Sequence, residues 1–352
     1  MSWIPDVFST LKTWVFKKKL LKFSSRFRRD TQACFYCPEM CRFACPVSET
    51  LRDNSVTPRG KMSILHWMER GETPDKITGS AENALWYLEQ CTGCGRCTEY
   101  CLHEIDVAGA LRKARKDFYS PTLLPTLPSI GRDKNILFCE PGRQNWWRSR
   151  ANLLTRMNSP EVIEWTGPHK EWLQGKITSQ ALASWIDSFS DATNLWFESA
   201  EVAWFFLETC EELGRPVAKK VRLVWQEFFK DWASKELSAT EVFHESYHLS
   251  RLLPRVGVSV PMYERGLLPQ HSGWNVIDCG GEGFYREAHP EKANALRERF
   301  LNDLKSDGRT ATTIISQSLC CVEHLAADKQ GSVYWLDPVS YTHLRAHETG
   351  RN

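Results

Sequence analysis

The chain has 352 residues, of which 25% are charged, and its formal net charge is +2. This length leaves room for two or three domains of ordinary size. The nearly balanced charge predicts a soluble globular protein and excludes a general electrostatic attraction to nucleic acid. No run of about 18 apolar residues occurs, which argues against a membrane-spanning helix. The residues after Met1 also lack the small-residue cleavage site of a secretory signal.

Residues 1–29 differ in composition from the rest of the chain. Eight lysines and arginines accompany a single acid, Asp6, and aromatic and aliphatic residues lie between them at helical spacing. The pattern suits an amphipathic helix on an anionic membrane surface, and it suits equally a helix that docks on a partner or on the chain itself. The protein is expected to be cytoplasmic, and the first interpretation adds a peripheral position on the inner face of the membrane.

Eight of the thirteen cysteines form two quartets near the N-terminus. The second quartet has the spacing C-x2-C-x2-C-x3-C, in which three thiolates within seven residues can bind three corners of one 4Fe-4S cluster. The first quartet has one more residue between its second and third cysteines, and Pro46 follows it. So many cysteines at metal-binding spacing also indicate a reducing compartment. The two quartets are Cys34, Cys37, Cys41 and Cys45, and Cys91, Cys94, Cys97 and Cys101.

In two-cluster ferredoxins the fourth cysteine of each run binds the cluster of the other run. This rule predicts cluster 1 on Cys34, Cys37, Cys41 and Cys101, and cluster 2 on Cys91, Cys94, Cys97 and Cys45. Zinc is the alternative metal, because C-x2-C pairs also make tetrahedral sulfur sites. Two zinc ions would leave the third and fourth cysteines of each quartet unexplained. Gly93, Gly95 and the Cys45-Pro46 ending favour iron as well, the glycines because they let backbone amides approach the sulfur atoms.

Residues 46–90, between the quartets, predict mainly helices, with turn signals at 57–60 and 71–74. A further helix is expected after Cys101, with a basic strip interpreted as a solvated face. This long helix-prone connection indicates an α-helical ferredoxin domain over residues 30–117, in place of the short β-rich link of a small bacterial ferredoxin. The basic strip consists of Arg112, Lys113, Arg115 and Lys116.

Residues 118–131 form a linker that three prolines interrupt. Beyond the linker, residues 135–139 and 241–244 have the character of short strands, and helical repeats occur around 182–189, 202–213 and 221–232. This alternation predicts an α/β region of two similar halves, 132–237 and 238–338. The expected fold class is therefore α+β and multidomain. Residues 339–352 resemble adaptor read-through and are expected to be a non-native tail.

The order of two ferredoxin quartets, a proline linker and an α/β region resembles the heterodisulfide reductase-related iron-sulfur oxidoreductases. That family includes the iron-sulfur subunits of glycerol-3-phosphate and glycolate dehydrogenases, and its α/β region carries cysteine-rich C-C-G modules. Residues 244–251 follow the family motif H-D-P-C-H-L-x-R, residues 278–284 and 290–291 follow C-C-G-x-G-G and the later P-E, and residues 318–321 follow C-P-x-C.

Several family cysteines are replaced in this chain. Tyr247, Asp278 and Ser318 each stand where the family has cysteine. In the preceding half only Cys139 matches a motif cysteine, and residues 166–169 stand where a C-C-G would be expected. Both modules are therefore degenerate. Cys210 lies in a helix-like run and is interpreted as a core residue.

The resemblance implies that intact modules hold a cluster for disulfide chemistry. Here Cys279, Cys320 and Cys321 are a remnant of that set, and we interpret them as spare thiols on a docking scaffold. A metal site that uses Cys279, Cys321 and His248 is the alternative.

The main functional prediction is an electron-transfer iron-sulfur subunit of a multi-subunit oxidoreductase. Two 4Fe-4S clusters would relay electrons between a flavoprotein partner, which converts the substrate, and a quinone or other carrier. The first alternative is a catalytic subunit with a residual site around His248, Cys279 and Cys321. The second is a zinc-binding structural adaptor. No residue is assigned a catalytic role.

Overall fold

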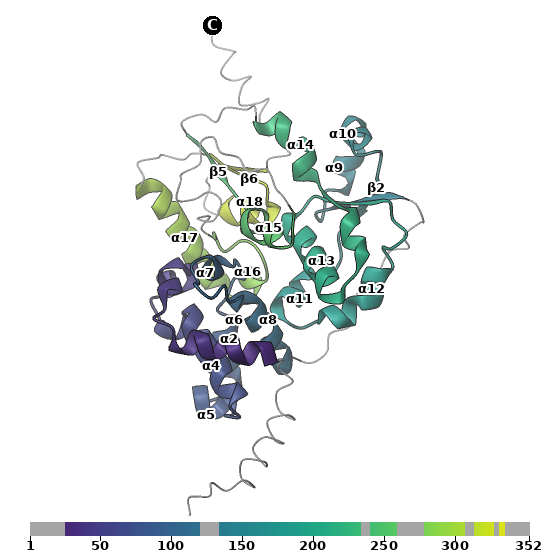
Figure 1. Ribbon diagram of the computed structural model, residues 1–352. Coiled ribbons are helices and arrows are strands. Elements are labelled where there is room, and N and C mark those ends of the chain that lie inside the picture. Colours follow the sequence, from purple (N-terminus) through teal and green to yellow (C-terminus); the bar gives the residue numbers. More distant parts are fainter. Residues whose placement is uncertain are drawn as a thin grey trace, which may run out of the picture. The chain divides into compact units, whose positions relative to one another are not determined.

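The computed structural model describes residues 25–119, 134–233, 240–258, 278–306, 313–326 and 331–334 (Figure 1). The chain divides into two compact units, Met1–Ser120 and Pro121–Asn352. Residues 1–24 of the basic segment, residues 120–131 of the expected linker and the whole expected tail lie outside the described residues. Across the described ranges, no helix combines the length and apolar character that a membrane span requires.

The described part of the first unit contains only helices and the segments that connect them. This architecture confirms the prediction of a helical N-terminal domain within an α+β fold. The elements are α2 (Ser25–Tyr36), η1 (Met40–Ala44), α3 (Pro46–Leu51), η2 (Asn54–Val56), α4 (Pro58–Glu69), α5 (Pro74–Thr78), α6 (Ala81–Glu89), α7 (Arg96–Glu99), α8 (Val107–Arg115) and η3 (Lys116–Phe118).

Local caps determine where the longer helices of this unit begin. The Thr57 hydroxyl accepts a hydrogen bond from the Gly60 amide at 3.0 Å, and Pro58 occupies the first turn of α4. Asp106 caps α8 in the same way through the Gly109 amide, also at 3.0 Å. The helices α4, α6 and α8 then bury one apolar core, which contains Met62, Leu65, Ala84, Leu88, Ala110 and Leu111.

The basic strip on α8 and η3 is not a solvated face, and that prediction is wrong for two of its four residues. Arg112 and Arg115 are buried, whereas Lys113 and Lys116 are exposed. The Arg115 guanidinium donates to the Leu88 carbonyl oxygen at 2.9 Å. This carbonyl belongs to the last turn of α6, where backbone oxygens lack helical partners and a cation is favourable.

The second unit contains two parallel sheets. The first has the order β2-β1-β3-β4 and the second the order β5-β6-β7. The strands are β1 (Asn135–Cys139), β2 (Glu161–Glu164), β3 (Asn194–Phe197), β4 (Val221–Leu223), β5 (Glu241–His244), β6 (Thr313–Ser316) and β7 (Gly331–Tyr334). The bounds of β1 and β5 match the strands expected from the sequence.

Helices connect the strands of both sheets, as parallel pairing requires. Residues 221–223 were expected to be helical, but they form β4, because they pair with β3 at the sheet edge, and the helix begins at Val224. The helices are α9 (Gln144–Arg148), α10 (Ala151–Arg156), α11 (His169–Gln174), η4 (Ser179–Leu182), α12 (Ala183–Asp187), α13 (Ala200–Leu213), η5 (Pro216–Lys220), α14 (Val224–Ala233), η6 (His248–Leu252), α15 (Leu253–Arg255), α16 (Tyr285–Ala288), α17 (Pro290–Ser306) and α18 (Leu319–Ala326).

A buried carboxylate connects several segments at the carboxyl-terminal edge of the first sheet. Glu198 directly follows β3, and its side chain is fully buried. It accepts hydrogen bonds from Arg143 Nε at 2.6 Å, from Trp147 Nε1 at 2.9 Å and from the Glu140 amide at 3.0 Å. These partners compensate the burial of the charge and join the ends of β1 and β3 to α9.

Candidate iron-sulfur centres and a buried histidine-cysteine triad

One cavity of the first unit, which we call cavity A, is lined by three cysteines of the first quartet and the last two cysteines of the second. Its volume is about 80 Å³. Two of these cysteines lie in or near α2, one lies in η1, one lies in α7, and the fifth follows α7. The cysteines that line cavity A are Cys34, Cys37, Cys41, Cys101 and, in addition, Cys97.

A second cavity, cavity B, has the reciprocal composition. Its volume is about 20 Å³. Three of its cysteines come from the second quartet, and Cys45, which directly precedes α3, comes from the first. Cys97 lines both cavities, so the two cavities adjoin. The cysteines that line cavity B are Cys45, Cys91, Cys94 and Cys97.

The thiols around each cavity oppose one another's ionisation. Burial and the nearby Cys41, Cys37 and Cys101 thiols raise the pKa of Cys34 to about 12. Burial and neighbouring thiols likewise raise the pKa of Cys41 to about 12 and that of Cys97 well above its ordinary value. Four adjacent thiolates therefore require cations among them. Iron in a thiolate-bound cluster supplies that charge, so the residues present fit such a group.

The backbone of the second quartet turns through left-handed conformations. Gly93 has a φ of 82° and Gly95 a φ of 67°, angles that cost a glycine little. In the first quartet the left-handed residue is Glu39, with a φ of 70°. The Glu39 carboxylate accepts a hydrogen bond from the Thr57 hydroxyl and lies 3.8 Å from Arg59 Nη1. These contacts offset the backbone penalty of a non-glycine residue at that position.

A buried lysine adjoins cavity B. Lys61 on α4 is only 1% exposed, lines the cavity, and donates a hydrogen bond from its ammonium to the Gln90 carbonyl oxygen. Lys61 was not among the residues that the sequence pattern singled out. The sequence pattern that could have pointed to Lys61 is its position on the apolar face of α4, one turn from Ile64 and Leu65. A lysine on a buried face needs a polar partner, because lysine is rarely buried without one.

The wall of cavity A contains more exposed side chains than the wall of cavity B. Three apolar residues on its rim are exposed: Met40 by 64%, Tyr100 by 45% and Leu102 by 94%. We call these three residues the exposed rim. Cavity B is instead lined by side chains such as Val47 and Lys61, which are buried.

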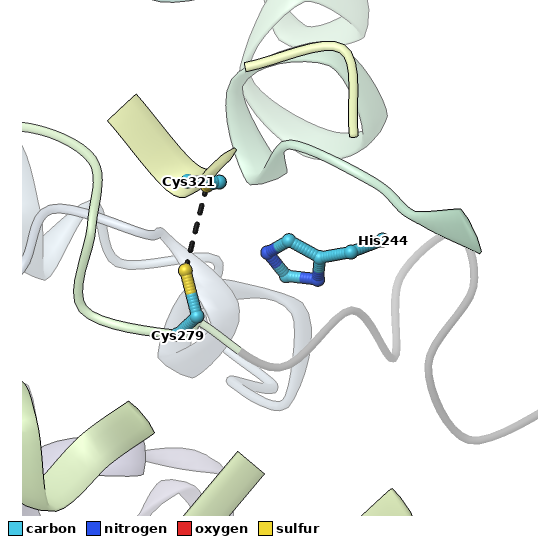
Figure 2. A group of neighbouring side chains, drawn as sticks. All are labelled: His244, Cys279 and Cys321. Carbon is cyan, nitrogen blue, oxygen red and sulfur yellow. Dashed lines mark hydrogen bonds between the residues drawn. The ribbon is translucent and has the colours of Figure 1, made fainter. Parts of the chain in front are cut away.

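A second group of metal-type side chains lies in the second unit. A ring nitrogen of His244 and the sulfur atoms of Cys279 and Cys321 all lie within 4.8 Å of one another, and we call this group the C-terminal triad (Figure 2). The two sulfur atoms are 3.4 Å apart. His244 ends β5 opposite Ser316, which ends β6, and α18 carries Cys321 soon afterwards. Parallel topology thus brings separate segments together at one sheet edge.

Burial and mutual contacts shift the pKa values of the three side chains of the C-terminal triad in different directions. The hydrogen bond between the Cys279 and Cys321 side chains lowers the pKa of Cys279 well below its usual range, and His244 acts in the same direction. Burial disfavours charge on His244, but the nearby Cys279 outweighs that effect and raises the histidine pKa. Burial and the hydrogen bond to Cys279 raise the pKa of Cys321. The arrangement favours a thiolate on Cys279.

The other cysteines and the histidine selected from the sequence lie outside this triad. His248 is buried with its Nδ1 atom 3.3 Å from Glu282 Oε2. Cys320 precedes Cys321 on α18 but is only partly buried. Cys139 is buried at the end of β1 with its sulfur 3.5 Å from the Ile163 carbonyl oxygen. Cys210 is completely buried in α13, which confirms its interpretation as a core residue.

His244 is the triad member that the sequence analysis missed. The sequence feature that could have pointed to His244 is its position as the last residue of an expected strand, because side chains at the ends of neighbouring parallel strands lie close together. The three positions where the resemblance leads one to expect cysteine bear polar side chains that contact the backbone or are buried. Asp278 accepts a hydrogen bond from the Gly280 amide at 2.8 Å, Ser318 accepts one from the Cys321 amide at 3.3 Å, and Tyr247 is buried.

Comparison with known protein families identifies the first of these two sites. Residues 30–105 match the family model of the 4Fe-4S dicluster domain. The matched segment contains all eight cysteines of the two quartets. No curated protein and no solved structure matches the chain. The N-terminal unit therefore contains an iron-sulfur domain of the 4Fe-4S dicluster type.

Proposed function

We propose that this chain is an electron-transfer iron-sulfur subunit of a multi-subunit oxidoreductase. The observation that carries the proposal is the adjoining pair of cysteine-lined cavities in a domain of the 4Fe-4S dicluster type. Cys97 and Val107 line both cavities. Two redox centres separated only by such side chains would be close enough to exchange electrons directly.

The proposed ligands of each cluster are chosen from the cysteines that line each cavity. Cluster 1 would be held by the first three cysteines of the first quartet together with Cys101, and cluster 2 by the first three of the second quartet together with Cys45. A bound 4Fe-4S cluster supplies reversible one-electron chemistry. The protein would hold the thiolates in place, provide Lys61 as a buried cation beside cavity B, and present exposed apolar side chains beside cavity A.

The exposed rim is the proposed contact with a redox partner. Met40, Tyr100 and Leu102 place apolar surface directly beside cavity A. Aromatic residues and methionine are enriched at protein interfaces, and a contact here shortens the path for an electron. Phe43 and Tyr36, both exposed, extend the apolar surface next to the first quartet.

The partner proposed is a flavoprotein dehydrogenase that performs the substrate chemistry, and a quinone or another carrier receives the electrons. The resemblance to iron-sulfur subunits of glycerol-3-phosphate and glycolate dehydrogenases supports this assignment. The replacement of family cysteines by Tyr247, Asp278 and Ser318 supports a docking role for the second unit. Residues 1–29 are proposed to hold the protein on the inner face of the membrane.

Anaerobic purification followed by iron and sulfide analysis tests this proposal. We expect about eight irons and eight labile sulfides per chain. Electron paramagnetic resonance of the reduced protein should show the magnetic interaction of two neighbouring paramagnets. Cys97→Ser should perturb both signals, because this residue lies between the cavities. A preparation that contains zinc in both quartets and no labile sulfide would contradict the proposal and favour the structural adaptor.

A further inference from the structure

We propose that the C-terminal triad binds one zinc ion through His244, Cys279 and Cys321. The site uses only residues of the second unit, and the proposal does not depend on the electron-transfer function. The three donor atoms are mutually within 4.8 Å, and all three residues are buried (Figure 2).

The geometry of the triad is close to that of a zinc site. Zinc binds sulfur at about 2.3 Å and imidazole nitrogen at about 2.0–2.1 Å, so tetrahedral ligands place two sulfurs about 3.8 Å apart. The Cys279 and Cys321 sulfurs are 3.4 Å apart and need to separate by only a few tenths of an ångström. A disulfide would need an S–S distance of about 2.05 Å, which is a larger displacement in the opposite direction.

The donor set also selects the class of metal. Two thiolates and one imidazole suit zinc, whereas magnesium and calcium prefer oxygen ligands. A 4Fe-4S cluster requires more thiolates, and Tyr247, Asp278 and Ser318 provide none. Two buried thiolates without a cation would be costly, and a divalent ion neutralises them.

The surrounding backbone holds the segment of Cys279 tightly against its neighbours. Gly280 has a φ of 82°, and a Cβ atom there would lie 3.0 Å from the Ala293 carbonyl oxygen of α17. A Cβ atom on Gly281 would lie 3.0 Å from the Cys320 carbonyl oxygen on α18. The two glycines therefore permit the close approach that places Cys279 beside Cys321.

Polar side chains next to the ligands fix their backbone. The Asp278 carboxylate accepts a hydrogen bond from the Gly280 amide, and the Ser318 hydroxyl accepts one from the amide of Cys321 itself. Such outer contacts orient metal ligands and support affinity. Three protein ligands leave a fourth position for water or a small exogenous ligand, as in zinc sites that are not fully closed by protein.

Metal analysis of the full-length, cluster-loaded protein tests the site. The protein is prepared anaerobically with zinc supplied, and zinc and iron are measured per chain for the wild type, Cys279→Ser, Cys321→Ser and Cys320→Ser. Cys320→Ser is the matched control, because it alters the adjacent thiol on α18 outside the triad. We expect one zinc per chain in the wild type and the control, and its loss in the two ligand variants with iron unchanged.

Cobalt binding by the wild-type protein provides a second measurement, and one variant extends it. Co²⁺ added to the zinc-depleted wild-type protein should produce a sulfur-to-cobalt charge-transfer band that saturates at one equivalent. His244→Ala should weaken cobalt binding by more than the roughly 10–100-fold typical of losing an outer-shell partner. Wild-type protein with no zinc and no cobalt band, or with a Cys279–Cys321 disulfide by mass spectrometry, would overturn the proposal. Iron content reports separately on the proposed electron-transfer function.

Discussion

The buried ammonium of Lys61 donates a hydrogen bond to the carbonyl oxygen of Gln90, the residue that precedes the second quartet. This contact fixes a positive charge beside cavity B. A nearby cation stabilises the reduced cluster, which carries one more negative charge than the oxidised cluster. Net charge near a cluster is among the factors that set its reduction potential.

The first prediction is that Lys61→Met lowers the midpoint potential of cluster 2 by more than about 60 mV, the equivalent of a tenfold change in a one-electron equilibrium. Redox titration followed by electron paramagnetic resonance measures this change. The matched control is Arg59→Met beside cavity A, because the Arg59 side chain is 41% exposed and its charge is screened by water. Equal shifts in the two variants would contradict the assigned role of the buried ammonium.

The second prediction concerns the left-handed turn of the second quartet. Gly93→Ala should lower stability by about 1–2 kcal/mol, because a side chain disfavours this conformation, and should reduce iron binding at cluster 2. Gly142→Ala is the control, since Gly142 has a φ of 77° and the same open surroundings but lies in the second unit. Iron analysis together with thermal unfolding separates the two effects. Loss of iron in both variants would argue against a local effect on the quartet.

The third prediction follows from the composition of the cavities. Cys45→Ser should weaken the signal of the cluster bound by Cys91, Cys94 and Cys97, although Cys45 belongs to the first quartet in sequence. Cys101→Ser should have the reciprocal effect. Electron paramagnetic resonance of each variant, with the Lys61→Met shift as the marker of cluster 2, assigns the lost signal. If each variant lost the cluster of its own quartet, the proposed ligand exchange would be wrong.

The fourth prediction concerns pH. Burial and the Glu198 carboxylate raise the pKa of Glu140 from 4.5 to about 8. Between these two values the folded protein retains a proton that the unfolded chain has released, so this group makes stability fall as pH rises through that window. Glu140→Gln should reduce that fall. Denaturant unfolding of the second unit in the intact protein, followed by tryptophan fluorescence, measures it.

The control for this prediction is Glu161→Gln, which alters an exposed carboxylate paired with Lys134 at 2.8 Å. Exposed pairs contribute at most about 1 kcal/mol, so the pH profile should keep the wild-type shape. An unchanged profile in Glu140→Gln would show that this carboxyl is not responsible for the decline.

The sequence was most informative where the determining interactions are local. Cysteine spacing identified the quartets because a cluster-binding loop is a short continuous segment. Residues 135–139 and 241–244 predicted β1 and β5 because each segment contains consecutive apolar residues of a buried strand, Ile136, Leu137 and Phe138 in the first and Val242 and Phe243 in the second. Residues 221–223 form a strand only because they reach the edge of β3, and no local pattern records that contact.

The features that could not be predicted from the sequence depend on contacts between residues that are distant along the chain. Arg115 is buried because the carbonyl oxygen of Leu88 lies within its reach, and only helix packing creates that pairing. His244, Cys279 and Cys321 come from three distant segments with no recurring spacing. Their convergence depends on the parallel register in which His244 lies opposite Ser316.

The exposed rim should affect how sensitive the proposed clusters are to oxygen. Dioxygen needs no complementary surface, so oxidants can also reach the exposed rim beside cavity A, and cluster 1 should be lost before cluster 2 when no partner covers the rim. A bound partner would cover Leu102, which is 94% exposed, and act as a shield. If the proposed partner exists, its binding would then protect the iron, and chains without it would be the first to lose iron during oxidative stress.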